Sequence, residues 1–140
     1  MFIPQKIDDP VFGQMELIDD EICYQGSVLF APLSQQIEIY VYSKSNGPSK
    51  NQHTLYREIE KRYSEWIEKL PSYVETYFPS PGRPRTTLEF TNKFEFSGIH
   101  IPELDATKNV WEIEYFTDGL DGWIEIQFIN WEPTSFLFGE

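Results

Sequence analysis

Three glutamates that alternate with hydrophobic residues are the groups of this chain whose type and spacing offer chemistry. Glu112 and Glu114 lie in the segment VWEIEYF, and Glu125 lies in WIEIQFI. Two carboxylates in different environments can act as general acid and general base, as in glycoside hydrolysis. Such a pair needs a cleft, and nothing in the pattern indicates one. A small hydrolase or a ligand-binding domain that uses surface carboxylates therefore stays an alternative interpretation, and an accessory protein with only a structural role is another.

Other patterns of catalytic and metal-binding residues are missing from the sequence. His53 and His100 each stand alone, without the paired His or Cys spacing of a zinc site. Cys23 has no basic neighbour in the sequence that would lower its pKa, so we expect it to be buried in a strand rather than to act as a nucleophile. No nucleophile elbow, phosphate-binding loop or dinucleotide-binding fingerprint occurs. We therefore predict a non-enzymatic protein with no catalytic residue, no metal and no cofactor.

Period-two alternation places the glutamates on strands. Before residue 50, the patterns FGQMELI, ICYQGSVLF and QIEIYVY each predict a strand. TLYREIEKRYSEWIEKL (54–70) has the spacing of one long amphipathic helix that stops or kinks at Pro71, and SYVETYF adds a short second helix. PSPGRPR is a loop, and strands are then predicted at TTLEF, KFEFSGI, VWEIEYF, WIEIQFI and TSFLF, with hairpin-turn residues at DGLDG.

This order of elements predicts the fold class. We expect a single α+β domain over residues 1–140, in which strands, a helix and further strands follow one another. A curved antiparallel β-sheet would pack against one long α-helix, because the helix carries a single apolar stripe and the strands need a cover on one face.

The charge of the chain is strongly negative and unevenly distributed. The formal net charge is −12, with −6 over residues 1–38, +3 over 39–93 and −9 over 94–140. Binding to nucleic acid or to an anionic membrane surface needs clustered lysine and arginine, so the composition argues against both partners. It favours a basic protein partner or, more simply, solubility alone.

The predicted strands give the acidic residues a common face. Opposite the apolar side chains, Glu112 and Glu114 on one strand would lie near Trp123 and Glu125 on the next. The ordinary interpretation is a solvated sheet face. The functional hypothesis is an acidic, aromatic docking surface for a basic partner, completed by Asp118 and Asp121 in the turn between the strands.

Residues 8–42 resemble a known kind of protein. DPVFGQMEL follows the pattern D-x-x-F-G-x-h-x-h, where h is apolar, and CYQGSVLF and IEIYVY continue it. The pattern is similar to that of small bacterial proteins of uncharacterised domain families that look like immunity proteins of polymorphic toxin systems. Tyr24 stands where a Trp is common in them. The resemblance implies an inhibitor that neutralises a basic toxin, and it carries no catalytic residue.

The same sequence features predict a compartment. The first ten residues lack the basic and apolar regions of a secretory signal, no apolar run approaches the roughly 20 residues of a membrane-spanning helix, and Cys23 is the only cysteine. We expect a cytoplasmic protein. The sequence does not indicate an oligomeric state.

Overall fold

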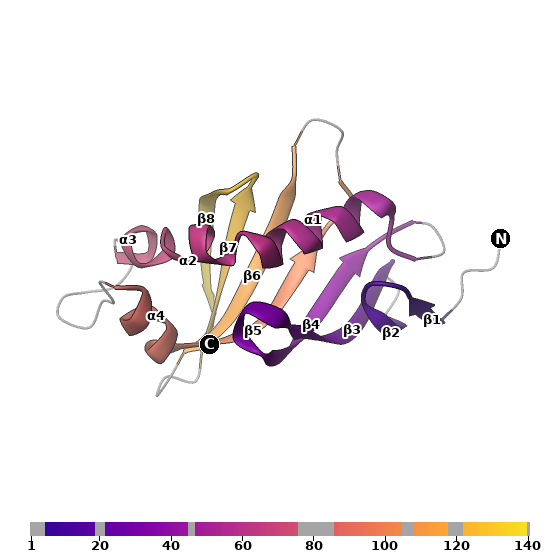
Figure 1. The fold of residues 1–140 in the computed structure, drawn as a ribbon, viewed down its shortest axis with the longest axis horizontal. Helices are drawn as coiled ribbons and strands as arrows, with labels where there is room; N and C mark the ends of the chain where they lie inside the picture. The colour runs from indigo at the N-terminus through magenta and orange to yellow at the C-terminus, as the bar shows by residue number, and fades with distance from the viewer. Residues whose placement is uncertain are drawn as a thin grey trace.

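The structure is a computed structural model that describes residues 5–18, 22–44, 47–75, 86–104, 108–117 and 122–139. Its centre is one eight-stranded sheet in which the strands lie in sequence order, from β1 at one edge to β8 at the other (Figure 1). The strands are β1 (Lys6–Asp9), β2 (Gly13–Ile18), β3 (Cys23–Phe30), β4 (Gln35–Tyr42), β5 (Phe94–Ile101), β6 (Val110–Thr117), β7 (Trp123–Ile129) and β8 (Glu132–Gly139).

Helical segments connect the two halves of the sheet. A short 3-10 turn, η1 (Ala31–Leu33), joins β3 to β4. The chain then runs through α1 (Lys50–Lys61), α2 (Tyr63–Ile67), α3 (Leu70–Glu75) and α4 (Thr87–Lys93) before it enters β5. These helices lie in front of the sheet in Figure 1, so they cover one of its two faces.

The predicted fold class is wrong in its helix and in its sheet. The described chain is mostly β, with 51% strand and 29% helix, and it has no single long helix packed on a curved sheet. The sheet is mixed, because β4 and β5 are parallel while every other neighbouring pair is antiparallel. The reason is the helical crossover: a chain that leaves one strand, crosses a face in helices and returns to the neighbouring position arrives parallel.

Trp66 explains why the predicted helix over 54–70 is broken. Its indole N–H donates to the carbonyl of Ile59 (2.8 Å). In a continuous helix that carbonyl would accept the N–H of Tyr63 instead. The chain turns at Arg62, whose φ and ψ are −98° and 16°, and α2 starts at the next residue. The turn brings the Trp66 ring into the core, where it contacts Trp111 and Phe128.

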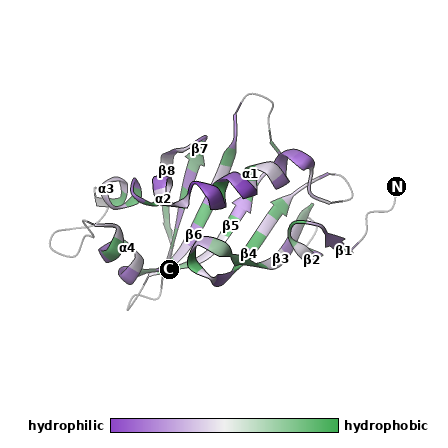
Figure 2. Cartoon of the chain, viewed as in Figure 1, coloured by the Kyte–Doolittle hydropathy of each residue, from purple (hydrophilic) through white to green (hydrophobic). Residues whose placement is uncertain are grey.

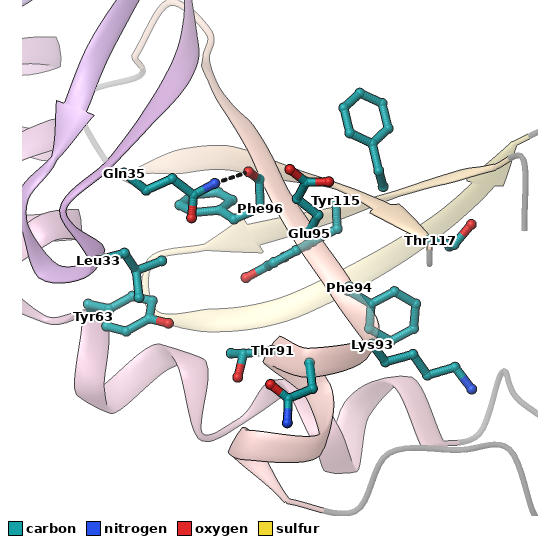
Figure 3. Close-up of a pocket in the computed structure, with 12 residues that line it drawn as sticks. Leu33, Gln35, Tyr63, Thr91, Lys93, Phe94, Glu95, Phe96, Tyr115 and Thr117 are labelled. Carbon is teal, nitrogen blue, oxygen red and sulfur yellow. Dashed lines mark hydrogen bonds between the residues drawn. The ribbon is translucent and has the colours of Figure 1, made fainter. Parts of the chain in front are cut away.

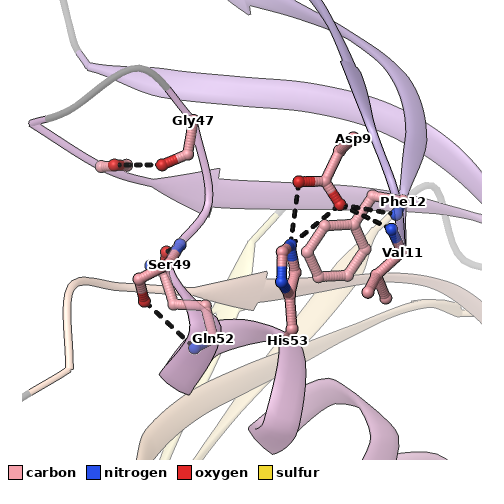
Figure 4. A network of polar contacts seen from close by, with 8 residues as sticks. Asp9, Val11, Phe12, Gly47, Ser49, Gln52 and His53 are labelled. Atoms are coloured by element: carbon pink, nitrogen blue, oxygen red, sulfur yellow. Dashed lines mark hydrogen bonds and ion pairs between the residues drawn. The ribbon is translucent and has the colours of Figure 1, made fainter.

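Capping side chains set the starts of two helices. The Ser49 hydroxyl accepts the N–H of Gln52, and the Gln52 side chain accepts the N–H of Ser49, which is a capping box for α1 (Figure 4). Residues 86–90, predicted as a strand, instead start the helix α4, because the Thr86 hydroxyl accepts the N–H of Glu89 at its first turn. Pro71 lies in the first turn of α3, where its missing N–H costs nothing.

The core lies between the helices and the sheet. Figure 2 shows hydrophobic residues along the strands and hydrophilic residues along α1. The side chains that face the helices on β3 to β7 are nearly all apolar and buried, and the predicted strands over 12–18, 22–30, 36–42, 93–99, 110–116 and 123–129 are confirmed by β2 to β7. Cys23 is buried, as predicted.

The segment DPVFG turns the chain between β1, which the sequence analysis did not predict, and β2. Asp9 is buried at the end of β1, and its Oδ2 accepts the N–H groups of Val11 and Phe12, each at 2.9 Å (Figure 4). His53 of α1 approaches the same carboxylate, with Nε2 at 2.8 Å from Oδ1. Gly13 ends the turn at φ +73°, a conformation that glycine adopts without steric cost. The carboxylate thus fixes both the hairpin and its position on α1.

No helix of the described residues is long and apolar enough to cross a membrane.

Replacing Asp9 by alanine should destabilise the protein by about 2 to 3 kcal/mol, because the buried N–H of Phe12, the partly buried N–H of Val11 and the ring of His53 lose their common acceptor. Chemical denaturation measures this change. Asp8→Ala is the matched control: Asp8 is exposed and adjacent, so its removal should change the free energy of unfolding by no more than about 0.5 kcal/mol. Equal effects of the two changes would contradict this role of the Asp9 carboxylate.

Candidate functional site

The sheet face opposite the helices is the candidate site, and we call it the open face. Its central strands, β4 to β7, present side chains that alternate with the buried core residues. Strands β3 to β8 contain glutamates but no lysine or arginine; among the described strands only β1 supplies a basic residue, Lys6, at the sheet edge. The side chains of the open face at its centre are Gln25, Glu38, Tyr40, Ser97, His100, Glu112, Glu114, Glu125 and Gln127.

The structure brings three of the predicted site residues together. Glu114 of β6 lies directly opposite Glu125 of β7, and Glu112 lies two residues further along the same strand. Gln127 donates to Glu112 at the limiting distance of 3.5 Å. Like charges directly opposite each other on neighbouring strands destabilise a sheet. At neutral pH, Glu114 and Glu125 therefore repel each other across the two strands at the centre of the open face.

A β-bulge in β5 supplies the groups that contact Glu114. The register between β5 and β6 shifts between Phe96 and Gly98. Residues 97 and 100 would lie on opposite faces of a regular strand, but the extra residue puts both on the open face. Ser97 Oγ donates to Glu114 Oε1, and His100 Nε2 donates to Glu114 Oε2, each at 3.2 Å.

Tyr40 and Gln25 extend the cluster across β4 and β3. The Tyr40 ring stacks on the His100 imidazole, with 4.4 Å between the ring centroids and 9° between the planes. Gln25 Nε2 donates to Glu38 Oε2 (3.2 Å). Burial raises the pKa of Tyr40, and the nearby Glu38 and Glu114 raise it further. The neutral phenol therefore persists at all ordinary pH values beside the carboxylates.

The pKa values of the two opposed glutamates are shifted in opposite directions. The hydrogen bond from His100 lowers the pKa of Glu114 below its usual value, and the hydrogen bond from Ser97 adds to this. Burial raises the pKa of Glu125, and Glu112 and Glu114 raise it further, against the opposing effect of His100. Glu125 receives no hydrogen bond from another described side chain, so an added cation would give this carboxylate a partner that the fold does not supply.

A groove runs along the open face where β4 and β5 separate. The two strands pair only from Glu38 to Val41 and from Gly98 to Ile101. Before these residues they part, and Gln35 Nε2 spans the gap to the carbonyl of Phe96 (2.8 Å). The resulting hollow of about 370 Å³ is the acidic groove; its lining includes Ser27, Gln36, Glu38, Tyr40, Glu95, Ser97, Glu114 and Phe116.

An apolar patch adjoins the acidic cluster. Phe116 lies opposite Trp123 in the register, and Glu125 lies opposite Leu137 of β8. Phe116 is 49% exposed and Leu137 is 56% exposed. The Trp123 ring lies so close over Gly139 that a side chain at that glycine would overlap it. Trp123 is therefore on the open face as predicted, whereas the predicted Asp118 and Asp121 lie outside the described residues.

The cluster has two chemical capacities besides binding a cationic side chain. His100, Glu114 and Glu125 offer one imidazole nitrogen and two carboxylate oxygens within 4.8 Å of one another, a set of ligand types that suits Zn²⁺ or Mn²⁺. Two neighbouring carboxylates whose pKa values are shifted apart also meet one requirement of an acid–base pair.

The sequence placed the glutamates, Trp123 and Tyr40 on one face, but it did not predict that His100 and Ser97 contact Glu114. The alternation in VWEIEYF and WIEIQFI was sufficient for the first set, because β6 and β7 are regular and antiparallel. The second set depends on the bulge and on the parallel pairing of β4 with β5. The SG pair in KFEFSGI was the available signal, since glycine within a strand often marks a bulge.

Comparison of the chain with protein-family models, with curated proteins and with solved structures gave no match. The function is therefore argued from the geometry of the open face.

Changing Glu114 and Glu125 separately should move stability in opposite directions, each within about 1 kcal/mol because both side chains are partly solvated. A lowered pKa in the folded state means that ionised Glu114 stabilises the fold above about pH 4.5, and that this stability is lost as the pH falls through the lowered pKa. Glu114→Gln should therefore destabilise the protein at pH 7, and this effect should shrink as the pH falls below about 4.5. The pKa of Glu125 is shifted in the opposite direction, so ionised Glu125 destabilises the fold. Glu125→Gln should therefore stabilise the protein at pH 7.

Urea denaturation at pH 7 and at low pH measures both effects, with Glu65→Gln on α2 as the control for removing one exposed negative charge. Shifts of equal sign for Glu114→Gln and Glu125→Gln at pH 7 would contradict the opposed environments.

Proposed function

We propose that this chain is a non-enzymatic binding protein that captures a basic protein on the open face of its sheet. The observation that carries this proposal is the concentration of glutamates on the uncovered face, on strands that hold no lysine or arginine. Glu114 and Glu125 oppose each other at its centre at a cost to the sheet. Departures from local rules of this kind are expected at functional sites.

The acidic groove gives the partner a specific chemistry. Three carboxylates, those of Glu38, Glu95 and Glu114, line it together with the rings of Tyr40 and Phe116. A guanidinium group pairs with carboxylates through directed hydrogen bonds and packs favourably over aromatic faces. An arginine of the partner, inserted into the groove, is the occupant that fits all five side chains.

The apolar patch next to the groove supplies the second component of an interface. Exposed aromatic and aliphatic side chains supply most of the affinity of protein interfaces, while surrounding charge governs the rate of association and the choice of partner. Phe116, Trp123 and Leu137 lie beside the carboxylates in this way. The partner surface should therefore carry an apolar residue within reach of its basic side chains.

The resemblance of residues 8–42 to immunity proteins gives the partner a class. A toxin that acts on nucleic acid is commonly basic, and an acidic protein that covers its active surface inhibits it. The proposal is accordingly an immunity protein that neutralises a basic toxin. Its single cysteine, Cys23, supports a cytoplasmic location as part of this proposal.

A peptide of nine arginines tests the acidic groove directly. The triple change Glu38→Gln, Glu95→Gln and Glu114→Gln should weaken binding of this fluorescent peptide by about tenfold, since three contacts of roughly 0.5 kcal/mol each are lost. Fluorescence anisotropy at low salt measures the affinity.

The matched control removes the same charge elsewhere: Glu65→Gln and Glu68→Gln near α2, and Glu103→Gln after β5. This variant should bind the peptide within about twofold of the unchanged protein, because distant exposed charges are screened. Equal losses in the two triple variants would show that only net charge matters and would reject the groove. The same two variants, and the unchanged protein, then serve as baits in lysate of the host. A natural partner is a protein that the unchanged protein and the control variant retain and that the groove variant does not retain.

One observation favours a second candidate, a small hydrolase. Glu114 and Glu125 are close together with pKa values shifted apart, as an acid–base pair requires. Hydrolysis of 4-nitrophenyl glycosides, lost in both Glu114→Gln and Glu125→Gln, would favour the enzyme over the binding protein. Absence of turnover by the unchanged protein would leave the binding function as the one supported by the open face.

A further inference from the structure

A second hollow lies beside the helices, away from the carboxylate cluster. Its volume is about 450 Å³, within the range of small-molecule sites. Segments far apart in the sequence form it: η1, β4, α2, α4, β5 and β6 (Figure 3). We call it the tyrosine pocket; its lining includes Leu33, Tyr63, Thr91, Phe94, Phe96 and Tyr115.

The hydroxyl of Tyr115 has no partner in the described part of the chain. Tyr115 is only 2% exposed, and no described residue donates a hydrogen bond to its hydroxyl or accepts one from it. A buried hydroxyl without a partner is uncommon in proteins, because leaving it unpaired costs most of its hydration energy. Figure 3 shows the hydroxyl groups of Tyr63 and Tyr115 both pointing into the hollow. The fold thus directs a hydrogen-bond donor into an accessible space.

The walls of the tyrosine pocket are rigid and aromatic. The Tyr115 ring packs against Phe96 at 5.2 Å and against Phe90 at 5.0 Å between centroids. Tyr63 is fixed by edge contacts with Phe30 at 5.5 Å and with Trp66 at 5.0 Å. Because these rings are held by the core, the pocket is formed before a ligand arrives, which lowers the entropic cost of binding.

The charges at this pocket are not directed at the two hydroxyl groups. Lys93 and Glu95 belong to the lining, but their side chains point away from the space between Tyr63 and Tyr115 (Figure 3). A charged ligand group placed there would lose hydration without gaining a counter-ion. Flat aromatic walls favour a ring, and a free phenol proton favours an acceptor.

We propose that the tyrosine pocket binds a small neutral ring compound through a carbonyl oxygen that accepts the Tyr115 hydroxyl proton. This proposal does not rest on the proposed partner-binding function, because the hydroxyl groups of Tyr63 and Tyr115 play no part in the acidic groove, although Glu95 and Phe116 line both hollows. Tyr63 provides the second hydroxyl next to the same oxygen.

A matched pair of ligands tests the hydrogen bond. Acetophenone carries a ring and one carbonyl acceptor, whereas ethylbenzene has nearly the same shape and no acceptor. The protein should bind acetophenone about fivefold more tightly than ethylbenzene, the ratio that one net hydrogen bond supplies. Titrations followed by two-dimensional amide NMR give both affinities, and the shifted resonances should belong to residues around Tyr115, Tyr63 and Thr91.

Two variants make the test specific. Tyr115→Phe removes only the hydroxyl, so the acetophenone-to-ethylbenzene ratio should fall to about one, while Tyr40→Phe on the open face should leave it unchanged. A ratio near one in the unchanged protein, a ratio that survives Tyr115→Phe, or shifts that map away from the pocket would each overturn the proposal.

Thermal unfolding adds a readout that needs no ligand. If the Tyr115 hydroxyl is unpaired in the free protein, Tyr115→Phe should leave the melting temperature unchanged or raise it. A clear fall would mean that the hydroxyl makes a structural hydrogen bond within the fold, and the ligand proposal would then be abandoned.

Discussion

Trp66 holds the helical layer on the sheet, and the rest of the architecture depends on its burial. Its indole N–H donates a hydrogen bond to the carbonyl of Ile59, and this bond interrupts the helix at the end of α1. Its ring lies in the core and contacts aromatic residues of β3, β5, β6 and β7. One side chain therefore both breaks the helix and attaches its second part to the strands. Because all the helices are committed to this face, the opposite face of an eight-stranded sheet is left without a cover from them.

The uncovered face explains the charge of the protein. A sheet face in contact with water needs polar side chains, and charge on it also discourages association through sheet edges. That requirement would be met by glutamate and lysine in equal number. The central strands instead carry glutamates and no lysine or arginine, and Glu114 and Glu125 lie directly opposite each other. Solvation is sufficient to explain polarity but not the single sign of charge or the bulge that adds His100 and Ser97.

The acidic groove and the tyrosine pocket have one structural origin. β4 and β5 belong to different halves of the chain and pair over four residues each, before which the two strands lie apart. The acidic groove lies on the open face of this separation, and the tyrosine pocket lies toward the helices; Gln35, Glu95, Phe96 and Phe116 line both. The short parallel pairing left by the helical crossover thus creates space on both sides of the sheet. The first space is acidic and the second is aromatic and neutral.

The sequence by itself determined the strands β2 to β7, their two faces and the identity of the acidic residues, because period-two alternation is local; it missed β1 and predicted a strand where α4 begins. It also placed Glu112, Glu114, Trp123 and Glu125 on one surface. The tertiary structure decided what no local pattern contains. The parallel pairing follows from the crossover, the broken helix from the indole of Trp66, and the partners of Glu114 from one extra residue in β5. These features depend on contacts between residues that are distant in sequence, so their energies enter only when the chain has folded.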